Sequence, residues 1–313
     1  METVAVVLER PEQLQLKRLE LADPTEDDVL VAVEWTGIST GTERLLFTGR
    51  MPSFPGLGYP LVPGYEAVGR VQWAGGRSGR TVGERVFVAG ARCFGETRSL
   101  FGGSASRLVV PGQRALPFDE ALGEQGVLFA LAATAYHAAW GVNGPAPDLI
   151  VGHGALGRLL ARLTVALGHT PPTVWEKSAV RREGAQGYPV IDPGDDHRRD
   201  YRAIYDVSGD SRLLDELVSR LAPGGEIVLA GFYSDPPSFQ FAPAFLREAR
   251  FRVAAEWRPD DLDATVRLAN QGRLALDGLV THRFAHDRAQ EAYATAFGDP
   301  SCVKMILDWR ECS

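Results

Sequence analysis

Hydrophobic residues in the first 120 positions form short runs that glycine and proline interrupt. The runs at 4–8, 29–38 and 82–88 have the length and the β-branched content of strands. A polar turn follows residue 38, and an apolar loop rich in proline and glycine extends from 49 to 64. Many short strands separated by such turns predict a mostly β domain over residues 1–120, and we expect a small barrel.

After residue 120 the pattern changes to alternating strand-like and helical segments. Leu159, Leu160, Leu163 and Leu167 repeat at helical spacing directly after the apolar run 148–151. Further strand-like runs lie at 173–175, 190–192, 203–208, 226–231 and 251–255. This alternation predicts an α/β domain over residues 121–258, with a doubly wound parallel sheet of six strands. We expect residues 259–313 to return to the first domain.

A glycine-rich segment joins the strand at 148–151 to the helix that follows. It reads Gly152-His153-Gly154-Ala155-Leu156-Gly157. Glycines at this spacing between a strand and a helix predict a site for a dinucleotide, whose pyrophosphate meets the free N–H groups of the helix N-terminus. We expect His153 to shape this turn rather than to do chemistry. The alternative is a glycine-rich turn that binds no ligand.

Glu176 ends the next strand, 19 positions after the last glycine. A carboxylate at this place binds the adenosine ribose hydroxyls and would repel a 2′-phosphate, so Glu176 favours NAD over NADP. Arg181 and Arg182 oppose this preference, because either could receive a 2′-phosphate. The remaining predicted cofactor residues are Thr134, Lys177, Ser208 and Gly231.

The composition restricts the class of protein. The net charge of −7 argues against nucleic acid as the main partner. Three cysteines without a pairing pattern favour a cytoplasmic protein without disulfides. No apolar run has the length of a membrane helix, and the N-terminal run is too short for a signal peptide, so we expect no integral membrane segment.

The chain resembles the medium-chain dehydrogenase/reductase family along nearly its whole length. The matching segments lie at 64–69, 82–86, 134–138, 152–157, 281–284 and 303–308. This resemblance implies a GroES-like substrate domain and a Rossmann domain, and homodimers are frequent in the family.

The chain departs from the zinc alcohol dehydrogenases of this family at the metal ligands. Thr40 and Tyr65 stand where those enzymes carry cysteine and histidine, and their third ligand falls near Ala130. A hydroxyl, a phenol and a methyl group provide no thiolate or imidazole ligand. We therefore expect no catalytic zinc. With only Cys93 in the corresponding region, we expect no structural zinc either.

A longer stretch narrows the resemblance to family members that act on magnesium tetrapyrroles. It comprises residues 37–46, 49–52 and 59–66. It implies NAD-dependent oxidation of the 3-(1-hydroxyethyl) group of a bacteriochlorin to a 3-acetyl group. Two alternatives stay open: a zinc-free reductase of quinones or enones, and a non-catalytic nucleotide-binding regulator.

Without a metal, side chains must handle the proton of the alcohol. Tyr65 is a candidate base, but its normal pKa near 10 must be lowered for that role, by a nearby lysine or the cationic nicotinamide. Alternatively, Tyr65 fills the vacated metal site. Glu66 is a candidate proton acceptor, and the alternative is a structural carboxylate. Thr40 is a candidate hydroxyl relay, and the alternative is a hydroxyl that caps the turn. His137 is a candidate proton relay, and the alternative is a structural histidine.

A flat apolar substrate needs an apolar surface, which residues 47–59 offer. The candidates for the macrocycle face are Phe47, Met51, Phe54, Leu57 and Tyr59. The alternative is ordinary loop packing. Arg44 or Arg50 is the candidate partner of the substrate propionate, and the alternative is a solvated surface arginine.

Overall fold

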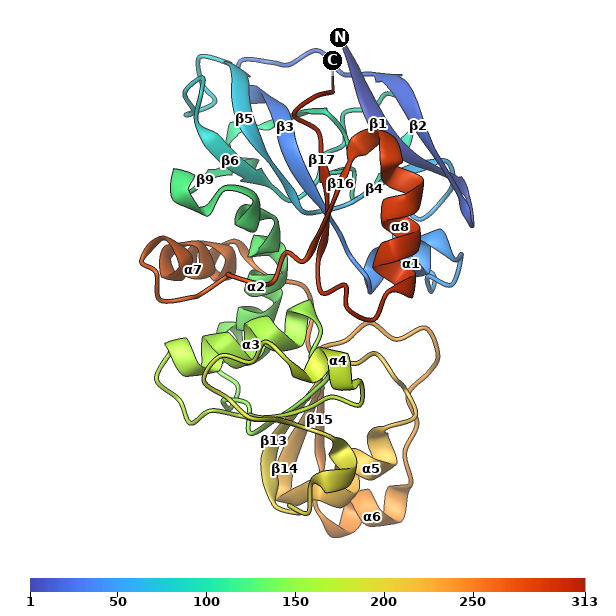
Figure 1. Cartoon of the computed structure of the whole chain (residues 1–313), viewed down its shortest axis with the longest axis vertical. Helices are drawn as coiled ribbons and strands as arrows, with labels where there is room; N and C mark the ends of the chain where they lie inside the picture. Colours follow the sequence, from blue (N-terminus) through green and yellow to red (C-terminus); the bar gives the residue numbers. More distant parts are fainter. Residues whose placement is uncertain (313) are drawn as a thin grey trace. The chain divides into compact units, whose positions relative to one another are not determined.

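The computed structural model describes residues 1–312, which form two compact units (Figure 1). The first unit combines Met1–Ala130 with the C-terminal residues from Leu279 onward, and the second is Leu131–Gly278. These bounds differ from the predicted domains 1–120, 121–258 and 259–313. The return to the first unit begins at Leu279 because the helix that follows residue 258 packs within the second unit.

Two β-sheets form the frame of the first unit. The seven-stranded sheet runs in the order β16 (His282–Ala285), β17 (Met305–Asp308), β3 (Asp28–Ile38), β5 (Ala67–Ala74), β6 (Arg85–Val88) and β9 (Ala115–Pro117), with β8 (Arg107–Pro111) paired to β3. The four-stranded sheet runs in the order β2 (Gln13–Glu20), β1 (Glu2–Arg10), β4 (Leu61–Pro63) and β7 (Arg98–Leu100). Apolar side chains from both sheets fill one core, to which Leu8, Val31, Leu61 and Leu307 belong.

Short helices complete the first unit. They are α1 (Thr42–Phe47), α8 (Ala289–Gly298) and the 3-10 turns η1 (Gly112–Arg114), η2 (Glu120–Leu128) and η5 (His286–Arg288). The ring of Phe47 in α1 lies 5.7 Å from the ring of Phe297 in α8. The C-terminal helix therefore covers the turn that follows β3.

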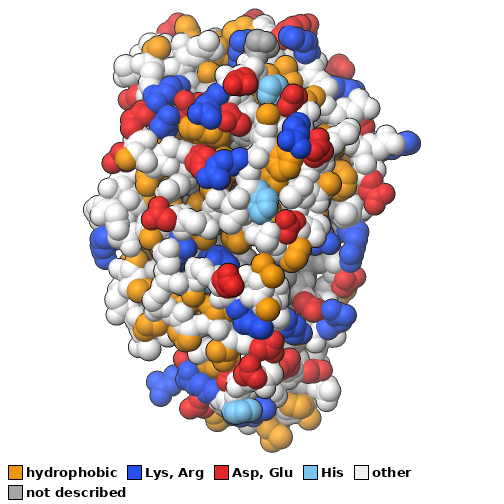
Figure 2. All heavy atoms as spheres, in the orientation of Figure 1, with side chains coloured by type: hydrophobic (Ala, Val, Ile, Leu, Met, Phe, Trp, Pro, Cys, Tyr) orange, Lys and Arg blue, Asp and Glu red, His pale blue; other side chains and the backbone are white. Residues whose placement is uncertain are grey.

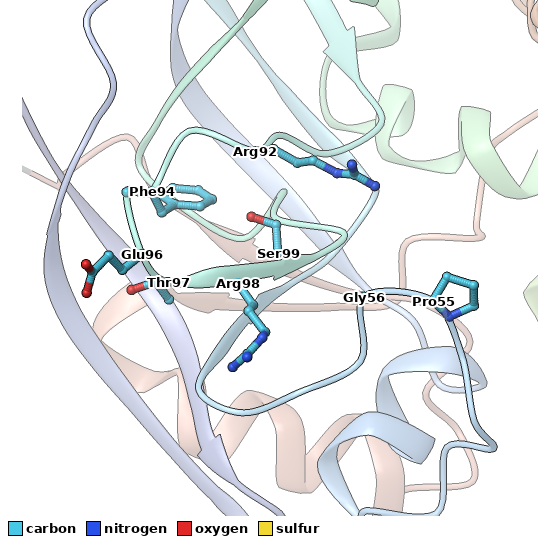
Figure 3. Close-up of a pocket in the computed structure, with 9 residues that line it drawn as sticks. Pro55, Gly56, Arg92, Phe94, Glu96, Thr97, Arg98 and Ser99 are labelled. Carbon is cyan, nitrogen blue, oxygen red and sulfur yellow. The ribbon is translucent and has the colours of Figure 1, made fainter.

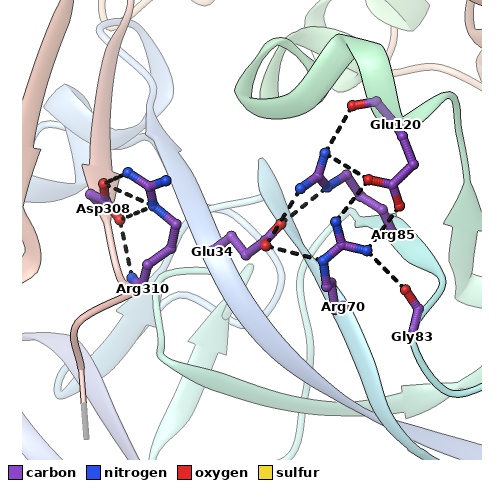
Figure 4. A network of polar contacts seen from close by, with 7 residues as sticks. All are labelled: Glu34, Arg70, Gly83, Arg85, Glu120, Asp308 and Arg310. Carbon is purple, nitrogen blue, oxygen red and sulfur yellow. Dashed lines mark hydrogen bonds and ion pairs between the residues drawn. The ribbon is translucent and has the colours of Figure 1, made fainter.

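Arginine and carboxylate side chains tie β3, β5 and β6 to η2 (Figure 4). Arg70 lies 3.3 Å from a carboxylate oxygen of Glu34 and 2.7 Å from one of Glu120. Arg85 lies 3.1 Å from Glu34 and 3.0 Å from Glu120.

Basic and acidic side chains are interspersed over the face shown in Figure 2. The surface charges of this face are thus largely mixed rather than gathered by sign.

The second unit contains the predicted parallel sheet of six strands. The order is β12 (Val190–Ile191), β11 (Thr173–Trp175), β10 (Leu149–Val151), β13 (Tyr201–Asp206), β14 (Leu221–Leu229) and β15 (Arg250–Val253). All neighbouring pairs are parallel. The order reverses between β10 and β13, which is the place where ligands bind in such sheets. The predicted α/β fold class is confirmed.

The helices of this part of the chain are α2 (Phe129–Tyr136), the π-helical turn η3 (His137–Gly141), α3 (Ala155–Ala166), α4 (Ala179–Arg182), η4 (Pro193–Asp195), α5 (Leu214–Arg220), α6 (Phe241–Leu246) and α7 (Pro259–Asn270). Within residues 1–312, none of the helices combines the length and the apolar character that crossing a bilayer requires.

Candidate active site

The turn between β10 and α3 has the geometry of a phosphate-binding loop. Gly152 has φ +106°, a conformation that a side chain would strain. A Cβ at Gly157 would lie 1.9 Å from the carbonyl oxygen of Gly152, so only glycine allows the loop to close there. Gly154 precedes α3, caps it without a side-chain hydrogen bond, and has open space at its Cβ position. The N-terminus of α3 is therefore accessible to a phosphate group.

Glu176 is held against this loop by backbone N–H groups. One carboxylate oxygen accepts from the N–H of His153 at 3.1 Å, and the other accepts from the N–H of Ser178 at 2.8 Å. Each oxygen keeps a second lone pair for a ribose hydroxyl. Lys177, the next residue, is exposed. Arg182 binds Asp192 at 2.9 Å and donates to the carbonyl of Glu176, so its guanidinium group is already engaged.

His153 lies fully buried beneath the loop. Its Nδ1 is 2.6 Å from the carbonyl oxygen of Arg181, which can only accept, so Nδ1 carries the hydrogen and Nε2 accepts from the hydroxyl of Tyr188 at 3.0 Å. Burial lowers the pKa of His153 to about 4, which keeps the ring neutral. Arg158 donates to the carbonyls of His153, Arg181 and Glu183. Sequence reasoning did not identify Arg158.

Predicted cofactor residues also meet at the carboxyl ends of β13 and β14. The N–H and hydroxyl of Ser208 donate to Asp206 at 2.9 and 2.6 Å, and the N–H of Gly231 donates to the carbonyl of Asp206 at 2.9 Å. A Cβ at Gly152 would lie 3.4 Å from the Cα of Ser208. The structure thus brings Gly152, Ser208 and Gly231 together. Burial raises the pKa of Asp206, a residue that the sequence did not single out.

His137 and Thr134 come from the α2–η3 segment. His137 is buried, and its Nδ1 lies 2.7 Å from a carboxylate oxygen of Asp261 in α7. The same oxygen accepts from the N–H of Arg258 at the start of α7. This contact joins η3 to α7 and supports the structural alternative for His137, while Thr134 is partly exposed.

In the first unit, Tyr65 donates a hydrogen bond from its hydroxyl to Oγ of Ser39 at 2.8 Å. Burial and the nearby charge of Glu66 raise the pKa of Tyr65 above its normal value. Lys304, a buried lysine of this unit, pairs with Glu66. The side chains around Tyr65 therefore favour the protonated phenol, and the role of Tyr65 as a base stays a prediction that depends on the cationic nicotinamide.

Glu66 and Lys304 form a buried ion pair. The ammonium nitrogen lies 2.8 and 2.7 Å from the two carboxylate oxygens, and each residue is only 1% exposed. The same nitrogen is 3.4 Å from the carbonyl oxygen of Ile38. The structural alternative for Glu66 thus has direct geometric support.

A second buried carboxylate, Glu43, lies beside this pair and was missed at the level of sequence. It accepts from the N–H of Ser39 at 3.0 Å and from the hydroxyl of Tyr293 at 2.5 Å. Burial is the main reason that its pKa rises to about 7. An acidic residue two positions before the apolar Leu45 and Leu46 was the available signal, but its burial depends on Tyr293 of helix α8.

The positions that correspond to metal ligands hold no such donors. Thr40 is partly exposed and Ala130 is fully buried. Among the residues that the structure describes, no three His, Cys, Asp or Glu side chains are grouped so that they could hold a metal ion.

The residues predicted to contact the macrocycle pack in different ways in the structure. Phe47 packs on Tyr293 at a ring distance of 6.2 Å, Met51 is 7% exposed, and the hydroxyl of Tyr59 donates to the carbonyl of Leu46. Met51 belongs to the core, and Phe47, Leu57 and Tyr59 pack against it. Arg44 and Arg50 are exposed.

Phe54 also packs against this core, and its ring is 6.3 Å from the ring of Phe101. The ring of Phe101 in turn lies 5.5 Å from the ring of Tyr65. Phe101, which sequence reasoning missed, therefore connects the apolar loop with the candidate catalytic tyrosine.

Comparison with known proteins identifies relatives in sequence and in fold. Residues 25–120 match the alcohol dehydrogenase GroES-like domain. The chain is 58% and 55% identical to the 2-desacetyl-2-hydroxyethyl bacteriochlorophyllide A dehydrogenases of Cereibacter sphaeroides and Rhodobacter capsulatus, over 99% of each chain. The structure of 2R,3R-butanediol dehydrogenase from Bacillus subtilis superposes with a TM-score of 0.83 at 20% identity, covering 98% of this chain and 99% of that one. A short chain alcohol dehydrogenase from Escherichia coli, complexed with NADH, gives a TM-score of 0.81 at 21% identity, with the same coverage.

The environment of Glu43 predicts a pH-dependent stability. Its pKa is about 7 in the folded state against an ordinary value of 4.5 for a solvated glutamate, so the folded state binds more protons between pH 4.5 and pH 7, and its stability falls as the pH rises through this range. The wild type should lose about 3 kcal/mol of unfolding free energy across this range relative to Glu43→Gln. Urea unfolding at several pH values measures the difference. The exposed Glu20→Gln is the control, and equal pH slopes for Glu43→Gln and the wild type would contradict the prediction.

Proposed function

The chain belongs to the 2-desacetyl-2-hydroxyethyl bacteriochlorophyllide A dehydrogenase family within the medium-chain dehydrogenases, and we propose that it oxidises the hydroxyethyl group of a bacteriochlorophyllide precursor to an acetyl group, with NAD as the hydride acceptor and without zinc. The enzyme is an oxidoreductase of bacteriochlorophyll biosynthesis. The full-length relationship to two dehydrogenases named for this substrate carries the proposal. The glycine loop and Glu176 support the cofactor.

The residues of the second unit fit a nicotinamide dinucleotide. The open N-terminus of α3 takes the pyrophosphate, and Glu176 offers its remaining lone pairs to the adenosine ribose hydroxyls. When bound, the nicotinamide supplies the hydride acceptor. Ser208 and Gly231 border the glycine loop at the point where the strand order reverses, which supports their predicted role in binding the cofactor.

The first unit contributes hydrogen bonds to the alcohol rather than a strong base. Tyr65 stays protonated, and with Ser39 and the adjacent Thr40 it offers hydroxyl groups to the substrate oxygen. The carbinol carbon is attached to a conjugated macrocycle, which delocalises positive charge as the hydride leaves. Complete removal of the proton before hydride transfer is therefore not required. The O–H bond breaks after the hydride has left, and the proton passes from the carbonyl oxygen through the hydroxyl groups that orient it to water.

The decisive experiment is direct turnover. The purified protein, incubated with NAD and a magnesium bacteriochlorin that bears the hydroxyethyl group, should produce the absorption shift of the acetyl product. The rate should be the same in the presence of EDTA. Failure to turn over the pigment while NADPH reduces a small quinone would favour the reductase. NADH binding without any turnover would favour the regulator, and inhibition by EDTA that zinc reverses would refute the metal-free mechanism.

Tyr65→Phe separates a hydrogen-bonding role from acid–base catalysis. Loss of one hydrogen bond should reduce kcat/KM about tenfold and leave the pH profile unchanged. A general base would contribute about 10²-fold to 10⁴-fold. Steady-state kinetics with the pigment measures the change, and Tyr59→Phe, whose hydroxyl donates to the Leu46 carbonyl, is the matched control. A loss beyond a hundredfold, with a pH limb removed, would show that the phenol moves the proton.

Glu176→Ala should weaken the preference for NAD. Removing the carboxylate relieves its repulsion of a 2′-phosphate, so the ratio of kcat/KM for NAD to that for NADP should fall about tenfold or more. Glu183→Ala removes a nearby exposed carboxylate and serves as the control. An unchanged ratio in Glu176→Ala would locate cofactor selection elsewhere in the loop.

A further inference from the structure

A pocket of about 530 Å³ lies in the first unit, between the segment 92–99 and the loop that contains Pro55 and Gly56 (Figure 3). Two arginines, Arg92 and Arg98, line it together with the buried ring of Phe94. Glu96 is the one carboxylate among the lining residues. Figure 3 shows the Glu96 side chain extending away from Pro55 and Gly56, whereas Arg92 extends toward their side.

Neither arginine of the pocket has a carboxylate partner among residues 1–312. In contrast, Arg70 and Arg85 of Figure 4 are each shared between two glutamates. Arg98 instead contacts the apolar loop 49–64, where its Nη1 donates to the carbonyl of Tyr59 at 3.5 Å. A Cβ at Gly58 would lie 3.0 Å from its Nε. The loop therefore positions Arg98 while most of its N–H donors stay available to an anion.

The pocket is next to the aromatic row that leads to Tyr65. Phe54 directly precedes the pocket residue Pro55, and its ring contacts Phe101, which contacts Tyr65. A flat substrate that covered Phe54 and Phe101 would have one edge at Tyr65, and its opposite edge, at Phe54, would lie next to the pocket that the two arginines line. A pigment of the chlorophyllide type carries an unesterified propionate on its rim.

On the basis of the proposed function, we propose that Arg92 and Arg98 bind the propionate carboxylate of the tetrapyrrole and make the enzyme selective for the free acid. Guanidinium groups bind carboxylates through paired charge-assisted hydrogen bonds, which a neutral ester cannot replace. Arg44 and Arg50 are not among the residues that line the pocket, and they stay the alternative partners of the propionate.

The test compares the free-acid pigment with its propionate methyl ester. For the wild type, kcat/KM should be about 10-fold to 100-fold higher for the acid, as expected for a hydrogen-bonded charge pair. In the double variant Arg92→Gln/Arg98→Gln, the value for the acid should fall to that for the ester, and the value for the ester should not change. Arg44→Gln and Arg50→Gln are the controls and should keep the preference for the acid.

Three results would overturn the inference. The first is a preference for the free acid that survives in the double variant. The second is loss of this preference in Arg44→Gln or Arg50→Gln. The third is an equal fall in kcat/KM for the acid and the ester in the double variant. Dissociation constants of both pigments, measured by fluorescence, report on the same selectivity without turnover. Wild-type protein that binds the acid tightly but oxidises neither pigment would therefore refute the proposed function and still decide whether these arginines bind the carboxylate.

Discussion

The first unit depends on a buried ion pair that joins the ends of three neighbouring strands. Glu66 immediately precedes β5 and Lys304 immediately precedes β17, while β3 lies between these strands and ends at Ile38. Gly37 leaves room for the ion pair next to β3, because a Cβ at this position would lie 2.0 Å from a carboxylate oxygen of Glu66. Removing each charge from water costs several kcal/mol, which only close contact and further hydrogen bonds offset. The pair therefore fixes where the C-terminal strand returns.

This pairing decides the chemistry of the groups around it. Burial raises the pKa of Glu43, and the nearby charge of Glu66 raises it further, while Lys304, which is hydrogen-bonded to Glu66, lowers it only in part. Tyr65 and Tyr293 face carboxylates, and burial in that environment raises the pKa of both phenols. Both phenols consequently stay protonated at neutral pH, whereas Glu43, whose pKa is about 7, is about half ionised there. Such a site suits an alcohol whose macrocycle stabilises the developing positive charge.

The sequence predicted those features that depend on local patterns. The six parallel strands and the glycine loop follow from runs of a few residues, whose backbone demands are satisfied within the same segment. The contacts of His137 with Asp261 and of Glu66 with Lys304 join residues 124 and 238 positions apart. No periodicity signals such pairs. Apolar spacing likewise could not separate Phe54, which contacts Phe101, from Phe47, which packs on α8.

Around the glycine loop of the second unit, the buried charges are arginines whose hydrogen bonds go to uncharged groups, in contrast to the Glu66–Lys304 ion pair of the first unit. Arg158 and Arg162 are each 5% exposed, yet their guanidinium groups donate to backbone carbonyls instead of carboxylates. Partners without charge leave the positive potential beneath the loop unneutralised, which favours an anionic pyrophosphate above it. A neutral His153 is required here, because a third buried cation would add repulsion without a partner. The hydrogen bonds from Arg158 to the carbonyls of Arg181 and Glu183 connect helix α3 to the segment that follows Glu176, so one hydrogen-bond network supports both the proposed phosphate site and the proposed ribose site.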